Sequence, residues 1–120
     1  MGAVVSIGLA ACSPTPSTLA HGPHGISQAN RNAAAVITIY NTGFTPTISR
    51  VPAGLNVLVI NDSGLNHSLT AFNGAFDTGL LAAGGDDASF VIAKPGTYRY
   101  YDEVNPSFQG EIVVTPAPAG

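Results

Sequence analysis

Residues 98–110 read Tyr-Arg-Tyr-Tyr-Asp-Glu-Val-Asn-Pro-Ser-Phe-Gln-Gly, a run of aromatic residues that passes into a polar loop. Aromatic residues are enriched in β-strands, and the Asn105-Pro106 dipeptide marks a turn or loop. A second polar stretch, Asn-His-Ser-Leu-Thr at residues 66–70, follows the turn signal Asp-Ser-Gly at residues 62–64. Each stretch therefore predicts a strand next to a loop that carries polar side chains.

Short strand signals, separated by Gly, Pro, Asn and Asp, occupy most of the chain. Residues 35–40 alternate, with Ile37 and Ile39 on one face, and residues 56–61 are apolar enough for a buried central strand. Residues 43–48 contain a Pro and suit a bent edge segment, because Pro cannot donate to a central ladder. Further strands are expected at residues 67–72, 88–92, 97–101 and 111–114. Roughly seven short strands predict an all-β, antiparallel β-sandwich, and the absence of Trp argues against an immunoglobulin-like one.

Composition excludes several classes of function. The chain has 120 residues and a net charge of −3, with four Lys and Arg residues, so we expect one small domain and no nucleic-acid binding. A single cysteine excludes an intramolecular disulfide. No Ser-His-Asp arrangement, Gly-rich phosphate loop or paired-carboxylate site is recognisable, so we do not expect an enzyme.

The first residues resemble a bacterial lipoprotein leader. An apolar run ends in Leu-Ala-Ala-Cys at residues 9–12, so residues 1–11 are interpreted as a signal peptide and Cys12 as the lipidated residue. About ten apolar residues are too few to span a bilayer, which needs roughly 20. No Lys or Arg precedes the run, which suits a leader truncated at Met1. The alternative is an N-terminal stretch with an incidental free cysteine.

This interpretation divides the chain into four parts. Residues 12–34 are rich in Ser, Thr, Pro, Gly and Ala and are expected to form a flexible tether between the lipid and a domain at residues 35–115. Residues 116–120 form a disordered tail. A lipid on Cys12 would place the domain at the outer face of a bacterial cytoplasmic membrane or in the periplasm.

Five motifs in order resemble the cupredoxins, small copper proteins of the plastocyanin and amicyanin kind. The resemblance covers residues 36–114 and implies a Greek-key β-sandwich. In that family an early His follows a strand, and a late loop supplies Cys, His and Met. The motifs lie at residues 44–48, 51–54, 61–67, 76–81 and 96–100.

The ligand positions depart from the family pattern. His67 matches the early His, but Asp102, Asn105 and Phe108 stand where the family has Cys, His and Met. A blue-copper centre requires a thiolate and two imidazoles with a weak axial ligand. Phe108 is tolerable at the axial position, whereas Asp102 and Asn105 remove two strong donors. The resemblance therefore implies a degenerate site.

Two interpretations of the remaining residues are open. His67 and Asp102, with Glu103 and the tether residues His21 and His24, could hold Cu(II) or another divalent ion loosely. Alternatively, His67 forms a hydrogen bond to Asp102 or Asn105 in the space that the metal left. We favour the second interpretation, and so expect no cofactor, with low-affinity copper as the alternative.

These inferences predict a membrane-anchored, non-enzymatic binding module. Its protein partner would dock on an apolar rim around Pro106 and Phe108, with Leu65 and Leu81 as further members. The alternative is a copper-binding scavenger or chaperone. A blue-copper electron carrier is a weaker candidate, because the thiolate is missing.

Overall fold

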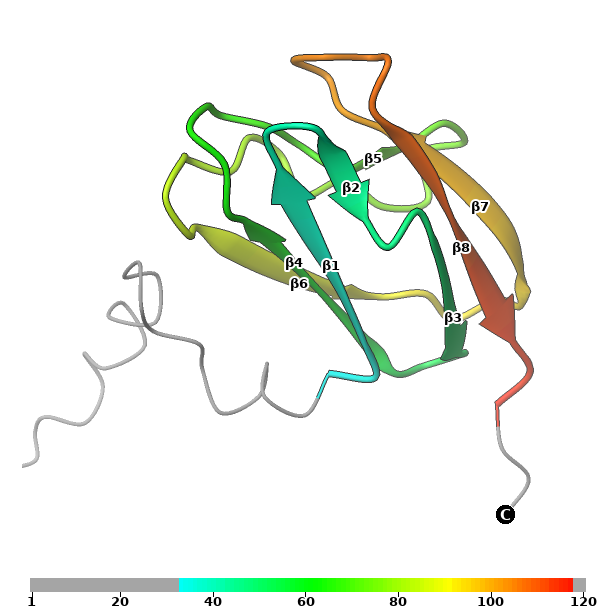
Figure 1. Ribbon diagram of the computed structural model, residues 1–120. Coiled ribbons are helices and arrows are strands. Elements are labelled where there is room, and N and C mark those ends of the chain that lie inside the picture. Colours follow the sequence, from blue (N-terminus) through cyan, green and yellow to red (C-terminus); the bar gives the residue numbers. More distant parts are fainter. Residues whose placement is uncertain (1–32, 118–120) are drawn as a thin grey trace, which may run out of the picture.

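The computed structural model describes residues 33–117 and contains eight strands in two four-stranded sheets (Figure 1). Within these residues, no helix is long and apolar enough to cross a membrane. Sheet I has the order β2 (Gly43–Thr45), β1 (Ala35–Tyr40), β4 (Asn56–Asn61) and β6 (Asp87–Val91). Sheet II has the order β3 (Ile48–Pro52), β8 (Gln109–Thr115), β7 (Gly96–Tyr101) and β5 (Thr70–Ala71). The expected all-β sandwich is confirmed.

Both sheets are mixed, so the expectation of a purely antiparallel sandwich is wrong. β1 pairs with β4 in parallel and β3 pairs with β8 in parallel, whereas the other pairs are antiparallel. The cause is the path of the chain. After β1 and β2 it crosses to sheet II for β3 and returns to sheet I for β4, and such a crossover brings β4 beside β1 in the same direction.

Alternation of side chains determines which face each strand buries. Ile37 and Ile39 of β1 are fully buried between the sheets, as their spacing predicts. β4 lies between β1 and β6, and Val57 and Val59 contribute to the core, which confirms a central strand. β2 is confirmed as an edge strand, since it pairs with β1 alone.

One expected strand is much shorter than its sequence pattern indicates. Residues 67–72 form ladder pairs only at Thr70 and Ala71, with an isolated bridge between His67 and Leu81. The amides between these points bind side chains instead. Leu69 N–H, for example, donates to Thr78 Oγ1 at 3.0 Å. Side-chain acceptors thus replace strand pairing along this segment.

An aromatic cluster fills the centre of the core. Tyr100 of β7 is fully buried, with its ring centroid 4.9 Å from that of Phe44 and 6.4 Å from that of Phe76. Burial raises the pKa of the Tyr100 phenol well above its usual value near 10. The hydroxyl lies against Gly110 of β8, the residue paired with Tyr100, so only a residue without a side chain fits there.

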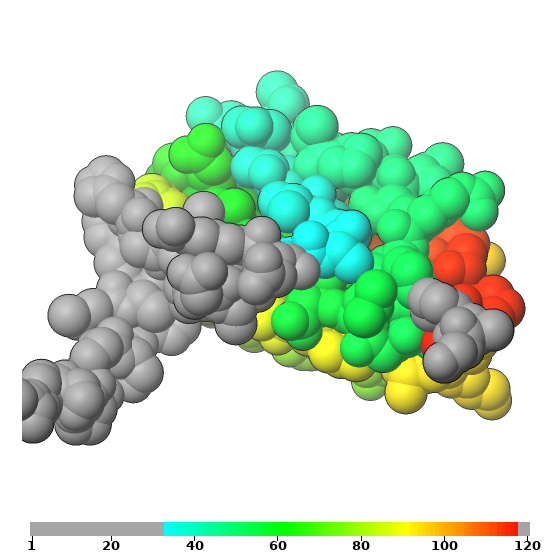
Figure 2. All heavy atoms as spheres, turned by 90° about the horizontal axis from the view of Figure 1, so that it is seen from below, coloured from blue at the N-terminus to red at the C-terminus, as the bar shows by residue number. Residues whose placement is uncertain are grey.

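The two ends of the domain emerge far from the loop that follows β7. Figure 1 shows the start of β1 and the end of β8 at the bottom, whereas residues 102–108 form the loop at the top. Figure 2 views the bottom of the molecule, where the first described residues (cyan) and the last (red) are visible. The loop end of the sandwich is therefore opposite the end at which the chain enters and leaves.

We predict that Gly110→Ala destabilises the domain, because an added Cβ would overlap the Tyr100 ring and hydroxyl. Overpacking of this kind costs about 1–3 kcal/mol of unfolding free energy, measurable by urea denaturation. Gly64→Ala is the matched control. A Cβ at Gly64 has only Asn41 Oδ1 nearby, at 3.8 Å, so the change should stay within about 0.5 kcal/mol. Equal stability of the two variants would contradict the prediction.

Candidate functional site

The candidate site is formed where three segments meet at the loop end of the sandwich (Figure 1). His67 lies at the end of the loop that follows β4, and it exchanges two backbone hydrogen bonds with Leu81, at 3.1 and 2.7 Å. Asp102 is the first residue after β7. Its amide donates to Phe108 O at 3.1 Å, which closes the base of the 102–108 loop. The structure thus brings together His67 and Asp102, as the sequence indicated.

Asn61 holds two of these segments in position. It is the last residue of β4 and is fully buried, and its Nδ2 lies 2.9 Å from Leu65 O, 2.8 Å from Leu81 O and 3.1 Å from Ala82 O. Its Oδ1 accepts a hydrogen bond from Ser63 Oγ at 2.6 Å. The Asn61 side chain therefore connects the loop before His67 to the segment at residues 81–82. This role was not predicted from the sequence, although a polar residue at the end of an apolar strand is a signal for it.

The Asp102 carboxylate is the centre of the site and has no exposed surface. Its Oδ2 contacts His67 Nδ1, and its Oδ1 accepts hydrogen bonds from Ser68 N–H at 2.9 Å and Val104 N–H at 3.0 Å. A buried carboxylate is tolerated only when such donors replace its water. Both carboxylate oxygens therefore have partners within the fold.

A second layer of hydrogen bonds supports the carboxylate. Ser68 Oγ accepts from Glu103 N–H at 2.9 Å and lies 3.0 Å from Thr70 Oγ1, which in turn donates to Asp77 Oδ1 at 3.1 Å. This connects the loop after β7 to β5 and to the segment that follows it. The network leaves Glu103 itself exposed, so its carboxylate does not join the buried pair.

Phe108 and Asn105 occupy different places around the pair. The half-buried ring of Phe108 packs on His67, with centroids 5.5 Å apart, and on Phe44 at 6.4 Å. Asn105 turns away, since its Oδ1 accepts from Ser107 Oγ at 2.7 Å and its carbonyl accepts from Phe108 N–H at 2.9 Å. Asp102 and Asn105 were the two expected hydrogen-bond partners of His67, and in the structure the partner is Asp102.

The described part of the chain does not fit a blue-copper centre, because His67 is its one histidine and it contains no cysteine. Among residues 33–117, no group of three His, Cys, Asp or Glu side chains could hold a metal ion. A metal between His67 and Asp102 would have to separate their contact, since each donor must lie about 2.0–2.2 Å from the ion. Cys12, His21 and His24 lie outside the described residues.

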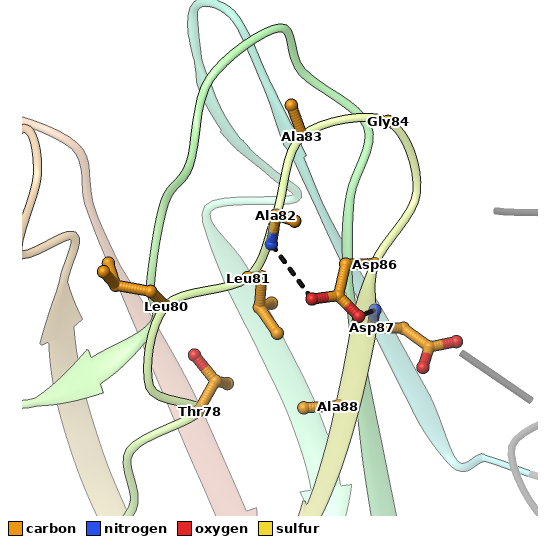
Figure 3. A pocket seen from close by; sticks show the side chains of 9 residues that line it. All are labelled: Thr78, Leu80, Leu81, Ala82, Ala83, Gly84, Asp86, Asp87 and Ala88. Carbon is orange, nitrogen blue, oxygen red and sulfur yellow. Dashed lines mark hydrogen bonds between the residues drawn. The ribbon is translucent and has the colours of Figure 1, made fainter. Parts of the chain in front are cut away.

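An open hollow lies beside the site. Its volume is about 680 Å³, and its lining includes Leu81, the backbone partner of His67, together with Asp86 (Figure 3). The Asp86 carboxylate accepts hydrogen bonds from Ala82 N–H and Asp87 N–H, each at 3.0 Å. Asp86 thus shapes the turn before β6.

The expected apolar rim needs one correction. Leu81 is buried, because its side chain joins the core while its backbone pairs with His67. Its neighbour Leu80 is exposed instead. Leu65 and Pro106 are exposed as expected, and Phe108 is half-buried.

Comparisons with known proteins agree with this geometry. A family model described as "Cupredoxin-like domain" matches residues 3–114. The chain is similar to a purple cupredoxin from Nitrosopumilus maritimus, with 26% identity, a TM-score of 0.62, and 68% of this chain and 99% of that chain covered. It is also similar to a reduced Cu(I) form of an amicyanin variant at pH 4, with 22% identity, a TM-score of 0.62, and 68% and 82% covered. No curated protein sequence matches. The cupredoxin-like fold is therefore confirmed.

We predict that Asp102→Ala lowers the free energy of unfolding by about 3–5 kcal/mol, because it leaves His67, Ser68 N–H and Val104 N–H without their buried acceptor. Asp102→Asn retains one oxygen for the two amides, so its loss should be smaller. Urea denaturation measures both.

Glu103→Gln is the matched control for these variants, since the Glu103 side chain is exposed, and we expect a change within about 0.5 kcal/mol. If Asp102→Ala were as stable as Glu103→Gln, the carboxylate would not organise the site.

Proposed function

Because the chain belongs to the cupredoxin-like domain family, we propose that it is a non-enzymatic binding module, held by lipid on Cys12 at the outer face of a bacterial membrane. The loop end, which carries copper ligands in the family pattern, serves here as a docking surface for a protein partner. Relatives with this fold include copper proteins, so a role in copper binding is the alternative.

This proposal rests on one observation: both oxygens of the Asp102 carboxylate have partners within the fold. The residue at the thiolate position binds one imidazole and two backbone amides inside the fold. A hard carboxylate in this arrangement stabilises the loop and does not provide the thiolate that a blue-copper electron carrier needs. The loop end retains its shape through internal hydrogen bonds, which suits a preformed binding surface.

Exposed apolar side chains around the buried pair support a docking role. Leu65 lies two residues before His67 and is 65% exposed, and Val104 lies two residues after Asp102 and is 49% exposed. Leu80 and Pro106 extend this set. From here on, the apolar rim means these four residues, which replace the expected set because Leu81 is buried and Phe108 is half-buried. All four lie in the segments that carry His67, Leu81 and Asp102, and exposed apolar side chains near one site favour an apolar partner surface.

The position of the domain ends supports the anchoring part of the proposal. The described chain begins and ends on the side opposite the apolar rim (Figures 1 and 2). A tether that enters there would leave the rim accessible to a partner. The lipid itself remains a proposal based on Leu-Ala-Ala-Cys at residues 9–12.

We predict that Leu65→Glu combined with Pro106→Glu strongly reduces partner capture. Two charges in an apolar contact should weaken binding by at least about tenfold, since each 1.4 kcal/mol corresponds to a factor of ten. The measurement is cross-linking in intact membranes with quantitative mass spectrometry. Ile48→Glu on the outer face of sheet II is the control, as Ile48 is 60% exposed, close to the 65% of Leu65. If the rim variant captured every partner that the unaltered chain captures, the proposed docking surface would be wrong.

The proximity of His67 and Asp102 leaves one second candidate, a low-affinity Cu(II) site in which the ion would replace their direct contact. Calorimetry with Cu(II) on the full chain, on His67→Ala and on a His21→Ala, His24→Ala variant distinguishes the candidates. The binding-module proposal predicts no change in Cu(II) heat on His67→Ala. The copper candidate predicts that His67→Ala removes the heat and that the tether variant retains at least part of it.

A further inference from the structure

The outer face of sheet II carries a row of four side chains that runs across all of its strands. Glu111 of β8 pairs with Arg99 of β7 on one side and with Ile48 of β3 on the other. Phe72, the residue after β5, donates its N–H to Arg99 O at 3.0 Å and so extends the row beyond β7. Across the sheet, the row therefore consists of Phe72, Arg99, Glu111 and Ile48.

The four side chains of this row point away from the core. Tyr100 is fully buried, so Arg99 beside it lies on the opposite face of β7, and the same alternation along β8 places Glu111 outward. Phe72 and Ile48 are 57% and 60% exposed. The row thus presents two apolar ends and, between them, two opposite charges.

The two charges of the row are available to a second molecule. Arg99 is exposed, and its Nη2 donates a hydrogen bond to Gln109 Oε1 at 3.2 Å. Within residues 33–117, neither Arg99 nor the half-buried Glu111 takes part in an ion pair.

We propose that this face binds the same face of a second copy of the chain, about a two-fold axis that runs parallel to the strands between β7 and β8. Such an axis exchanges the two halves of the row. Arg99 of each copy then faces Glu111 of the other, and Phe72 of each copy faces Ile48 of the other. The row is therefore complementary to itself in both charge and apolar character.

The charges also select the direction of the axis. An axis along the row itself would bring each side chain against its own counterpart, with Arg99 on Arg99 and Glu111 on Glu111. Like charges that face each other oppose association, so this arrangement is disfavoured. The axis parallel to the strands pairs every charge of the row with its opposite.

A shallow hollow beside the row suits an aromatic ring of the second copy. Its volume is about 200 Å³, and its lining includes Gln109 and Gly110 of β8. Tyr101 pairs with Gln109 within one chain, so the proposed axis places Tyr101 of each copy over Gln109 of the other, at the hollow. Tyr101 already packs on Phe72, with centroids 4.7 Å apart. This packing reduces the side-chain freedom that Tyr101 would lose on association.

The size of the face predicts a weak dimer. Four strands about 4.8 Å apart and a seven-residue strand with a rise of about 3.3 Å per residue give a face of roughly 14 by 23 Å. This is less than the roughly 800 Å² that each partner contributes to a standard stable interface. We therefore expect association at high chain concentration.

The proposed axis places both copies in the same orientation. Since it runs along the strands, both loop ends lie at one end of the dimer and both ends of the described chain lie at the other (Figure 1). The apolar rims of both copies would stay accessible, so loss of the dimer would not by itself remove the rim. The proposal does not depend on a lipid at Cys12.

Sedimentation equilibrium of the full chain at about 0.1–1 mM tests the proposal, with a thiol reductant present to keep Cys12 from forming a disulfide. Arg99→Glu gives a face with two negative charges and Glu111→Arg a face with two positive ones, so each variant alone should lose at least about tenfold in association constant. An equimolar mixture of these two variants should associate within about threefold of the unaltered chain, since each Glu then faces an Arg. Contacts within one chain cannot produce this recovery.

The controls change the net charge away from the face. Lys94→Glu in the turn between β6 and β7, and Glu103→Arg in the loop after β7, should leave the association constant unchanged. The double variant Arg99→Glu, Glu111→Arg exchanges the charges within one chain and should self-associate, which also shows that both replacements are compatible with folding.

Three results would contradict the proposal. The unaltered chain could remain monomeric at the highest concentration. Either single variant of the row could associate as strongly as its charge-matched control. Finally, the mixture of Arg99→Glu and Glu111→Arg could remain monomeric.

Discussion

Burial of the Asp102 carboxylate constrains the whole loop end of this domain. A charge without solvent must be met by donors, and the three that meet it come from His67, Ser68 and Val104. These donors lie on two segments that are far apart in sequence, so one carboxylate holds the loop after β4 against the loop after β7. Asn61 adds the segment at Leu81 to the same assembly. The exposed apolar side chains are positioned by this polar framework.

Sequence pattern was sufficient for the strands whose burial follows a simple period. Ile37 and Ile39 alternate, and the apolar run at β4 lies in the centre of its sheet. The direction of pairing was not predictable, because a strand's residues do not specify its neighbour. β5 is short because the amides of Ser68 and Leu69, just before it, bind side chains instead of a neighbouring strand, and no periodicity in the sequence reports such bonds.

The proximity of His67 and Asp102 was expected from the family resemblance, but its supporting groups were not. Ser68 and Val104 contribute backbone N–H groups, which every non-proline residue has and which therefore leave no mark in a sequence. The rim shows how sensitive such predictions are to register. Leu80 and Leu81 are adjacent and chemically identical, yet one is exposed and the other belongs to the core.

The place of β8 in sheet II has a consequence for biosynthesis. β8 is the last strand to be made, yet it lies between β3 and β7, and its partner β3 lies roughly half the chain length earlier. Sheet II cannot close until residues 109–115 have left the ribosome, because two of its three strand pairings require them. Such non-local pairing is slow. β3 and β7 are therefore without their shared partner until the last described strand has been synthesised.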